Sequence, residues 1–211
     1  MAEVEQELLE YKVLKTGSKG NCVIIGDIMV DCGIPFSKMK DDLYGIKYLL
    51  LSHIHSDHIV PSTLQKIKDL FPKITIIGNY EVAQKYGVDI IVNNGFETVT
   101  KDYTFMAVKG FHDVLVSGYS WWVKGQHVCY MTDSNSCSAF QSAPYDALFL
   151  EANYNENKLN AIGHSFKARG YNPILSAKRH CSTQVAKAFY YTNRRSVDSI
   201  FVELHQSARF Y

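Results

Sequence analysis

The chain has 211 residues, a length typical of a single domain. Hydrophobic residues make up 46% of it and charged residues 20%, which is the composition of an ordinary globular protein and excludes an intrinsically disordered one. The 22 Lys and Arg nearly balance the 21 Asp and Glu, which leaves a net charge of +1. This balance argues against a protein that grips long nucleic acid over many phosphates, although it is compatible with a local basic pocket.

Sequence features that would direct the chain to a membrane or out of the cell are missing. No apolar run reaches the roughly 18 residues of a membrane helix, and the first ten residues carry four Glu and no basic residue, unlike a secretory signal or transit peptide. We therefore expect a cytoplasmic protein with no membrane partner. Its cysteines are odd in number and show no paired spacing, so we expect reduced thiols; they are Cys22, Cys32, Cys129, Cys137 and Cys181.

The first half of the chain alternates short apolar segments with helical ones. The segment Lys47–Ser52 is apolar along its length, as in a strand covered on both faces, and Pro61 suits the first turn of a helix that runs to about Leu70. A second short helix is predicted over Glu81–Tyr86. The other predicted strands of this half are Tyr11–Leu14, Cys22–Ile25, Asp27–Asp31 and Ile74–Ile77.

The second half is richer in strands, because Val, Tyr, Trp and Phe are frequent there. Between Ala152 and Cys181 the pattern weakens, and we predict a long connection with a short helix near Glu156–Leu159. Ser182 can cap a helix that runs to about Tyr191. The predicted strands are Thr104–Val108, Leu115–Val123, His127–Met131, Ala147–Leu150 and Ile200–Leu204. Two groups of strands with helices between them predict a layered α/β fold, and the absence of linkers predicts one domain over residues 1–211.

The strongest chemical signal is the hexapeptide His53-Ile54-His55-Ser56-Asp57-His58, between a buried strand and a helix. It holds four imidazole or carboxylate side chains, which are ligand types that bind zinc. On a tight loop, His53 and His55 can converge on one metal while Asp57 and His58 turn toward a second.

This hexapeptide resembles the HxHxDH signature of the metallo-β-lactamase superfamily, whose fold is a four-layer αββα sandwich with metals at one edge. Three further segments, each after a predicted strand, match the rest of the family pattern: GFHDV, CYMTDS and FVELHQSARFY. Asp31, in MVDCG, resembles the Asp that braces the metal loop. The metal ligands that the resemblance implies are His53, His55, Asp57, His58, His112, Asp133 and His205, with Asp133 as the bridging carboxylate.

The tail of the chain resembles ribonuclease Z, a phosphodiesterase branch of that superfamily. His180-Cys181-Ser182-Thr183 precedes a predicted helix, and a His-x-Ser-x-Arg segment begins at His205. The resemblance implies that His205 is a metal ligand and that His180 is an acid that helps the leaving oxygen depart. Cys181 departs from the family's His-Ser-Thr segment, and the two histidines compete for the ligand role.

Two more segments look like motifs of single-domain bacterial and phage hydrolases of this superfamily, some of which are DNA exonucleases. They are Gly17–Cys22 (GSKGNC) and Leu150–Asn153 (LEAN). Within the second, Glu151 follows a strand and can orient His180. The remaining candidates are weaker. We interpret four of them as structural or solvated: His127, His164, Lys178-Arg179 and Arg194-Arg195. Two others, Lys167 and Arg169, are candidates for contacts with a phosphate.

The implied site predicts a hydrolase with two divalent ions, zinc or else manganese. Two metals about 3.5–4 Å apart can hold a bridging hydroxide and clamp the attacking and leaving oxygens of a phosphoryl displacement. Bound metal lowers the pKa of water toward ~7. We expect Asp57 to steer that hydroxide and His180, oriented by Glu151, to protonate the leaving oxygen.

The expected substrate is a small nucleotide, because the chain has neither a nucleic-acid clamp domain nor a long Gly/Pro-rich arm like that of ribonuclease Z. The combination is similar to phage-encoded phosphodiesterases of the anti-Pycsar type, which destroy 3′,5′-cyclic mononucleotide signals. A nuclease acting on DNA or RNA ends is the first alternative, and an ester, thioester or lactam hydrolase the second. A non-catalytic nucleotide-binding module and a redox diiron protein are disfavoured, and a homodimer is compatible with all of these.

Overall fold

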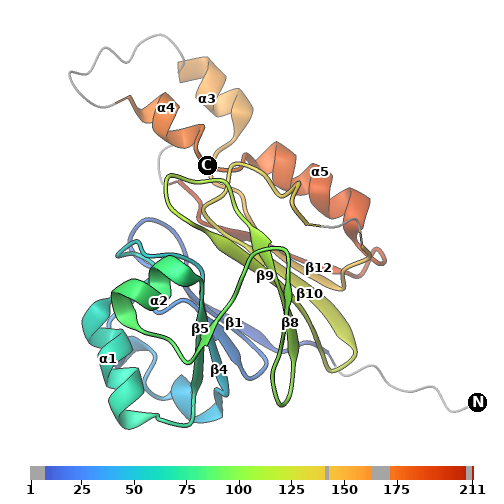
Figure 1. Cartoon of the computed structure of the whole chain (residues 1–211). Helices are drawn as coiled ribbons and strands as arrows, with labels where there is room; N and C mark the ends of the chain where they lie inside the picture. The colour runs from blue at the N-terminus through green and yellow to red at the C-terminus, as the bar shows by residue number, and fades with distance from the viewer. Residues whose placement is uncertain (1–7, 141–142, 163–171, 208–210) are drawn as a thin grey trace, which may run out of the picture.

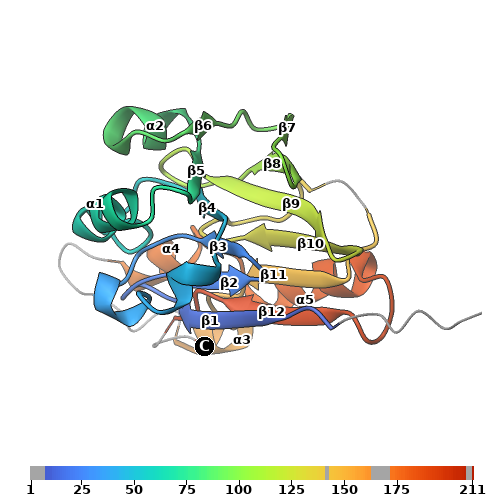
Figure 2. The ribbon, with the colours of Figure 1, turned by 90° about the horizontal axis from the view of Figure 1, so that it is seen from below.

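The computed structural model describes residues 8–140, 143–162, 172–207 and 211. Its framework is two mixed sheets of six strands each (Figures 1 and 2). The first sheet has the order β1-β2-β3-β4-β5-β6, and the second has the order β12-β11-β10-β9-β8-β7. The strands of the first sheet are β1 (Tyr11–Lys15), β2 (Cys22–Ile25), β3 (Ile28–Val30), β4 (Tyr48–Leu51), β5 (Thr75–Gly78) and β6 (Ile90–Ile91). Those of the second are β7 (Glu97–Val99), β8 (Thr104–Lys109), β9 (Ser117–Val123), β10 (Gln126–Met131), β11 (Ala147–Glu151) and β12 (Ile200–Leu204).

Helices cover the outer faces of both sheets. Side chains of α1 (Pro61–Leu70) and α2 (Tyr80–Tyr86) share an apolar cluster with the outer face of the first sheet, together with the 3-10 turns η1 (Phe36–Lys38) and η2 (Asp42–Gly45). Helix α5 (Thr183–Asn193) packs in the same way on the second sheet (Figure 1). The shorter helices α3 (Glu156–Ile162) and α4 (Pro173–Ala177) lie together at one end of the molecule. The four layers confirm the predicted αββα sandwich.

The two helix starts predicted at Pro61 and Ser182 are present, and Asn79 provides a further cap that was not predicted. Pro61 occupies the first turn of α1, where its missing N–H costs nothing. The Ser182 hydroxyl accepts a hydrogen bond from the Val185 amide at 3.1 Å and so caps α5. Asn79 caps α2 in the same way through the Val82 amide.

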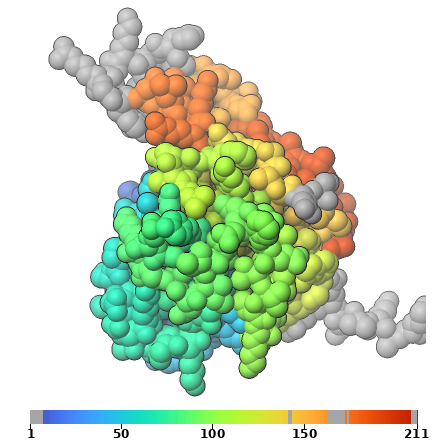
Figure 3. Space-filling view, viewed as in Figure 1, coloured from blue at the N-terminus to red at the C-terminus, as the bar shows by residue number. Residues whose placement is uncertain are grey.

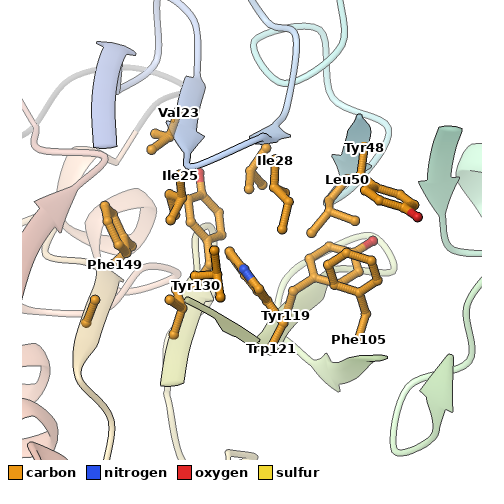
Figure 4. Packing of buried hydrophobic residues seen from close by; sticks show 14 of the residues in the cluster. Val23, Ile25, Ile28, Tyr48, Leu50, Phe105, Tyr119, Trp121, Tyr130 and Phe149 are labelled. Atoms are coloured by element: carbon orange, nitrogen blue, oxygen red, sulfur yellow. The ribbon is translucent and has the colours of Figure 1, made fainter. Parts of the chain in front are cut away.

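The main core lies between the two sheets, where successive residues of each strand point to opposite faces. In β4, Tyr48 and Leu50 point into this inner layer while Leu49 and Leu51 pack under the helices. Large aromatic side chains of the second sheet, among them Trp121 and Tyr130, meet them from the other side (Figure 4). This alternation explains why β4 is apolar throughout.

Some predicted boundaries were wrong for physical reasons. The β6 and β7 strands were not predicted because two- and three-residue strands give no readable periodicity. Strand β9 begins at Ser117 rather than at Leu115, since the Leu115 amide donates to Glu81 and its carbonyl accepts from the Asn79 side chain. The connection after Ala152 contains a second helix, α4, besides the predicted one.

Within the described ranges, no helix combines the length and apolarity needed to cross a bilayer. All five cysteines are buried and none is in a disulfide.

The two adjacent tryptophans provide a test of the inner core. Trp121 is 1% exposed, whereas Trp122 is 54% exposed and stacks on His127 with ring centroids 4.6 Å apart. We expect Trp121→Ala to lower the free energy of unfolding by about 3–5 kcal/mol, because it leaves a cavity. The matched variant Trp122→Ala loses the partly exposed stack on His127 and the contact of its ring with Arg195, and it should cost about 0.5–1.5 kcal/mol. Urea denaturation of both variants measures the difference, and equal losses would contradict this placement of the core.

Candidate metal and catalytic site

The candidate residues lie where several strands end. Strands β3 and β4 run parallel in the first sheet, and β10, β11 and β12 run parallel in the second. Parallel strands bring their carboxyl ends to one edge, which is where open α/β sheets bind ligands. The residues at or just beyond these ends are Asp31, Ser52, His53, Asp133, Glu151 and His205.

Three of these strand-end residues have a left-handed backbone. The φ angles are 61° at Asp31, 48° at Asp133 and 54° at His205. Among the described non-glycine residues, Lys124, in the turn between β9 and β10, is the other with positive φ. Such angles cost on the order of 1–3 kcal/mol each and concentrate at functional sites. In Asp31, Asp133 and His205, the positive φ occurs where the backbone leaves a strand and the side chain of the same residue joins the site.

One group of imidazoles is formed by His53, His55 and His112. The Nε2 atom of His53 lies 3.1 Å from Nδ1 of His55, and the ring centroid of His112 lies 5.2 Å from that of His55. Each of the three residues offers a ring nitrogen within 4.8 Å of the others. Three converging imidazole nitrogens can hold a transition-metal ion.

A second group is formed by Asp57, His58 and His205, whose possible ligand atoms also lie within 4.8 Å of one another. The Nε2 atoms of His58 and His205 both lie 3.7 Å from Oδ2 of Asp57. Asp133 stands between the groups: its Oδ2 is 2.8 Å from Nε2 of His58, and its Oδ1 is 3.6 Å from Nε2 of His205. It also clusters with His53. The structure thus brings all seven predicted ligands together, and their roles as ligands stay predictions.

Two buried carboxylates hold histidines by the ring nitrogen that faces away from the cluster. Asp31 lies 2.6 Å from Nδ1 of His58 and also accepts from the Ser52 hydroxyl. Glu151 lies 2.9 Å from Nδ1 of His205. A carboxylate on the far nitrogen is the usual support of a metal-binding histidine, because it fixes the tautomer and the ring orientation.

Two ring nitrogens fit a metal and have no hydrogen-bond partner. The Nε2 atom of His205 is buried and aimed at Asp57 and Asp133, and Nδ1 of His112 is also buried and unpartnered. A buried polar atom without a partner is costly. A cation at these nitrogens would remove that cost, so the residues fit a bound metal.

The electrostatics of the two groups differ. Burial lowers the pKa of His53 well below its ordinary value, and the nearby His58 lowers it further. Burial likewise lowers the pKa of His112. Neutral imidazole is the form that binds metals. These two histidines are therefore already in the ligand form near neutral pH.

In the second group, carboxylates outweigh burial. Burial opposes the charged form of His58, but Asp133 and Asp31 raise its pKa to about 10. The pKa of His205 is also raised well above its usual value, against burial, by Asp133 and Asp57. Burial raises the pKa of Asp133, yet His58 and His205 bring it well below the ordinary range. The negative charge here favours a cation, either a proton or a metal.

A partly buried histidine, His180, and the buried carboxylate of Glu151 form a pair next to these groups. The Oε1 atom of Glu151 accepts from Nδ1 of His180 at 2.7 Å, and the same oxygen contacts His205. Oε2 of Glu151 accepts from the Ser134 amide. Glu151 is fully buried, so it is not a surface carboxylate. It links the candidate acid to a candidate ligand, which is the orienting contact predicted for it.

Several contributors to the site were not assigned a role from sequence. The Asn21 amide of the GSKGNC loop lies 2.8 Å from Nε2 of His58. The Asn153 side chain donates to the His205 carbonyl at 2.7 Å.

Gly33 allows the metal loop to pack closely, since a Cβ there would be 1.8 Å from the Asp57 carbonyl. Asp113 lies 3.1 Å from Nε2 of His112. The two motifs quoted above contain Asn21 and Asn153 and were the signal that could have identified them.

The remaining candidates lie elsewhere. His127 packs between Trp122 and Tyr145 on the second sheet, in accord with a structural role. Arg195 pairs with Asp146 at 2.7 Å, and Arg194 lies over Tyr190 and Tyr191. His164, Lys167 and Arg169 are outside the described residues.

Comparison with protein-family models and with curated protein sequences finds no match. Solved structures do match. A metallo-β-lactamase fold protein, YhfI from Bacillus subtilis, superposes with a TM-score of 0.67 at 18% identity over 94% of this chain and 86% of that one. The short form of human tRNase Z superposes with a TM-score of 0.66 at 18% identity, over 94% of this chain and 93% of that one. A diphosphatase from the PhnP family superposes with a TM-score of 0.65 at 15% identity, over 95% of this chain and 87% of that one. These similarities establish that the chain has a metallo-β-lactamase fold.

Proposed function

We propose that this protein is a metal-dependent phosphodiesterase that acts on small nucleotides. The observation that carries the proposal is the pair of buried, carboxylate-braced histidines beside three further imidazoles, with ring nitrogens left unpartnered in the cluster. Phosphoester chemistry is supported by two neighbours of the same fold, which are named a tRNase and a diphosphatase.

The two ligand groups would hold two divalent ions, zinc or manganese. The first would bind to His53, His55 and His112, and the second to Asp57, His58 and His205, with Asp133 shared. Such ions, when bound, supply a nucleophile at neutral pH and offset the charge on the phosphate oxygens.

The side chains of the protein would orient water and move protons. The Asp57 side chain is 26% exposed, so its carboxylate can meet solvent and substrate while it contacts both histidines. It would accept a hydrogen bond from the attacking water and orient it. His180 is held through Nδ1 by Glu151, which leaves Nε2 to give a proton to the leaving oxygen. Glu151 is then a positioning residue.

Within this class, 3′,5′-cyclic mononucleotides are the first substrates to test. The near-zero net charge and the compact chain favour a small substrate over a long one. The decisive experiment incubates metal-loaded protein with cyclic nucleotides, single- and double-stranded DNA, RNA and a carboxyl ester. Metal-dependent opening of a cyclic nucleotide supports the proposal, and hydrolysis of the ester alone overturns it.

Salt dependence separates the small-nucleotide function from a nuclease. A small nucleotide makes few phosphate contacts, so we expect its kcat/KM to change little between 50 and 200 mM salt. A nucleic acid held over about 6–10 phosphates would lose affinity by roughly 10³–10⁵ over that range. Processive digestion of DNA or RNA with a steep salt slope, and no turnover of cyclic nucleotides, would favour the nuclease instead.

A further inference from the structure

A cavity lies directly beside the candidate metal site, since His112 is part of its lining. It has a volume of about 570 Å³ and opens next to His112. One wall is the chain from Lys109 to Leu115, which joins β8 to β9. The rest of the lining is formed by Asn135, whose amide donates to the Phe111 carbonyl at 3.2 Å, and by Lys178 and Arg179, which follow α4. In Figures 1 and 3 the yellow-green β8–β9 connection lies against the orange chain around α4.

The cavity is cationic. Lys109, Lys178 and Arg179 line it and are exposed, and no described carboxylate forms an ion pair with any of them. The lining also holds one acidic residue, Asp113, which lies 3.1 Å from His112 and 3.6 Å from His55. Three cationic side chains outnumber this single carboxylate, so the cavity keeps a net positive charge that can attract an anion. The exposure of Lys178 and Arg179 agrees with their sequence-based interpretation as a solvated charge pair.

The backbone holds these cations next to the candidate acid. Arg179 and His180 donate amide hydrogen bonds to the Ser176 and Ala177 carbonyls at 3.1 and 3.0 Å. This turn continues α4, whose N-terminus is capped by the Asn172 side chain. With His180 at the reacting phosphate, Lys178 and Arg179 would thus stand in the adjoining cavity, two residues and one residue before it in the chain.

We propose that this cavity is a subsite for a second phosphate group of the substrate. Lys and Arg side chains are the usual protein partners of phosphate, and Arg can bind it through two parallel hydrogen bonds. Phe111, 42% exposed in the same cavity, offers an apolar surface for the sugar or base between the two phosphates. The inference rests on the proposed function and narrows its substrate: nucleotides with a second phosphate, such as linear or cyclic dinucleotides, bind better than cyclic mononucleotides.

A pair of ligands that differ by one phosphate tests the subsite. Isothermal titration calorimetry measures the binding of adenosine 3′,5′-bisphosphate and of adenosine 5′-monophosphate to the metal-loaded protein. We expect the bisphosphate to bind roughly tenfold more tightly, as one or two charge-assisted contacts would give. In Lys178→Gln/Arg179→Gln this preference should disappear, so that the two ligands bind with about equal affinity.

The control variant Lys40→Gln/Lys73→Gln removes two lysines beside a separate cavity at η2 and the end of α1, and it should keep the preference. Metal content is measured in every sample, so that a change in the metals is not mistaken for a change in the subsite. Equal affinity of wild-type protein for the two ligands, or a preference that survives in Lys178→Gln/Arg179→Gln, overturns the subsite. Failure of the proposed function would look different: no phosphodiester would be hydrolysed, whatever the two affinities.

Discussion

The double variant His53→Ala/Asp133→Ala is expected to lose the bound metals. Purified wild-type protein should hold about two divalent ions per chain, as in two-metal hydrolases. The variant removes one of the three imidazoles of the first group and the carboxylate that lies 2.8 Å from His58 and 3.6 Å from His205. Both sites would be incomplete, so we expect well under one ion per chain by elemental analysis.

A second histidine gives the matched control. His127 is half-buried on β10, and no described group of potential ligands includes it. His127→Ala should therefore leave the metal content at the wild-type value. Circular dichroism confirms whether each variant is folded. A metal content that is unchanged in the double variant would contradict the assignment of these ligands.

Thermal unfolding gives an independent readout of the same prediction. A ligand that binds only the folded state stabilises it by RT ln(1 + [L]/Kd), or about 4 kcal/mol at a thousandfold excess over Kd. Chelation should thus lower the melting temperature of wild-type protein and of His127→Ala. It should have little effect on His53→Ala/Asp133→Ala, which has little metal to lose.

The sequence predicted the parts of the site that are local in the chain. Four candidate ligands lie between His53 and His58, so their convergence follows from one tight loop after one buried strand. The strand-end positions of Asp133 and His205 could be predicted because the strands before them are strongly apolar. Two groups of strands predicted a layered α/β fold, and the family resemblance implied the four-layer αββα sandwich, which is confirmed.

Two of the supporting contacts could not be predicted, because they join residues far apart in the chain. Asn21 meets His58 across 37 positions, and Glu151 meets His205 across 54. Neither spacing follows from a local pattern, since it depends on which strands become neighbours. The left-handed backbone at Asp31, Asp133 and His205 was not predicted either, because positive φ is uncommon even in Asp and His, in which it is enriched among non-glycine residues.

Substitution of the two histidines of the tail should have different effects: His205→Ala should lose metal, whereas His180→Ala should lose rate and keep its metal. Nε2 of His205 is buried, unpartnered and aimed at Asp57 and Asp133, so His205→Ala should remove about one ion per chain. Nδ1 of His180 is held by Glu151 at 2.7 Å, and although His180 shares a group of potential ligands with Asp133 and His205, we expect His180→Ala to keep both ions. It should lower kcat by about 10²–10⁴, the usual scale of general acid–base catalysis.

The leaving group distinguishes an acid from a residue that only maintains the shape of the site. A nitrophenolate leaves without a proton, whereas the alkoxide of a sugar needs one. The loss of rate in His180→Ala should therefore be small with bis(p-nitrophenyl) phosphate and large with a nucleotide substrate. Because one oxygen of Glu151 contacts both histidines at 2.7 and 2.9 Å, Glu151→Gln should reduce both the rate and the metal content. Loss of metal in His180→Ala with full retention in His205→Ala would reverse the two roles, and an equal loss of rate with both leaving groups would exclude His180 as the acid.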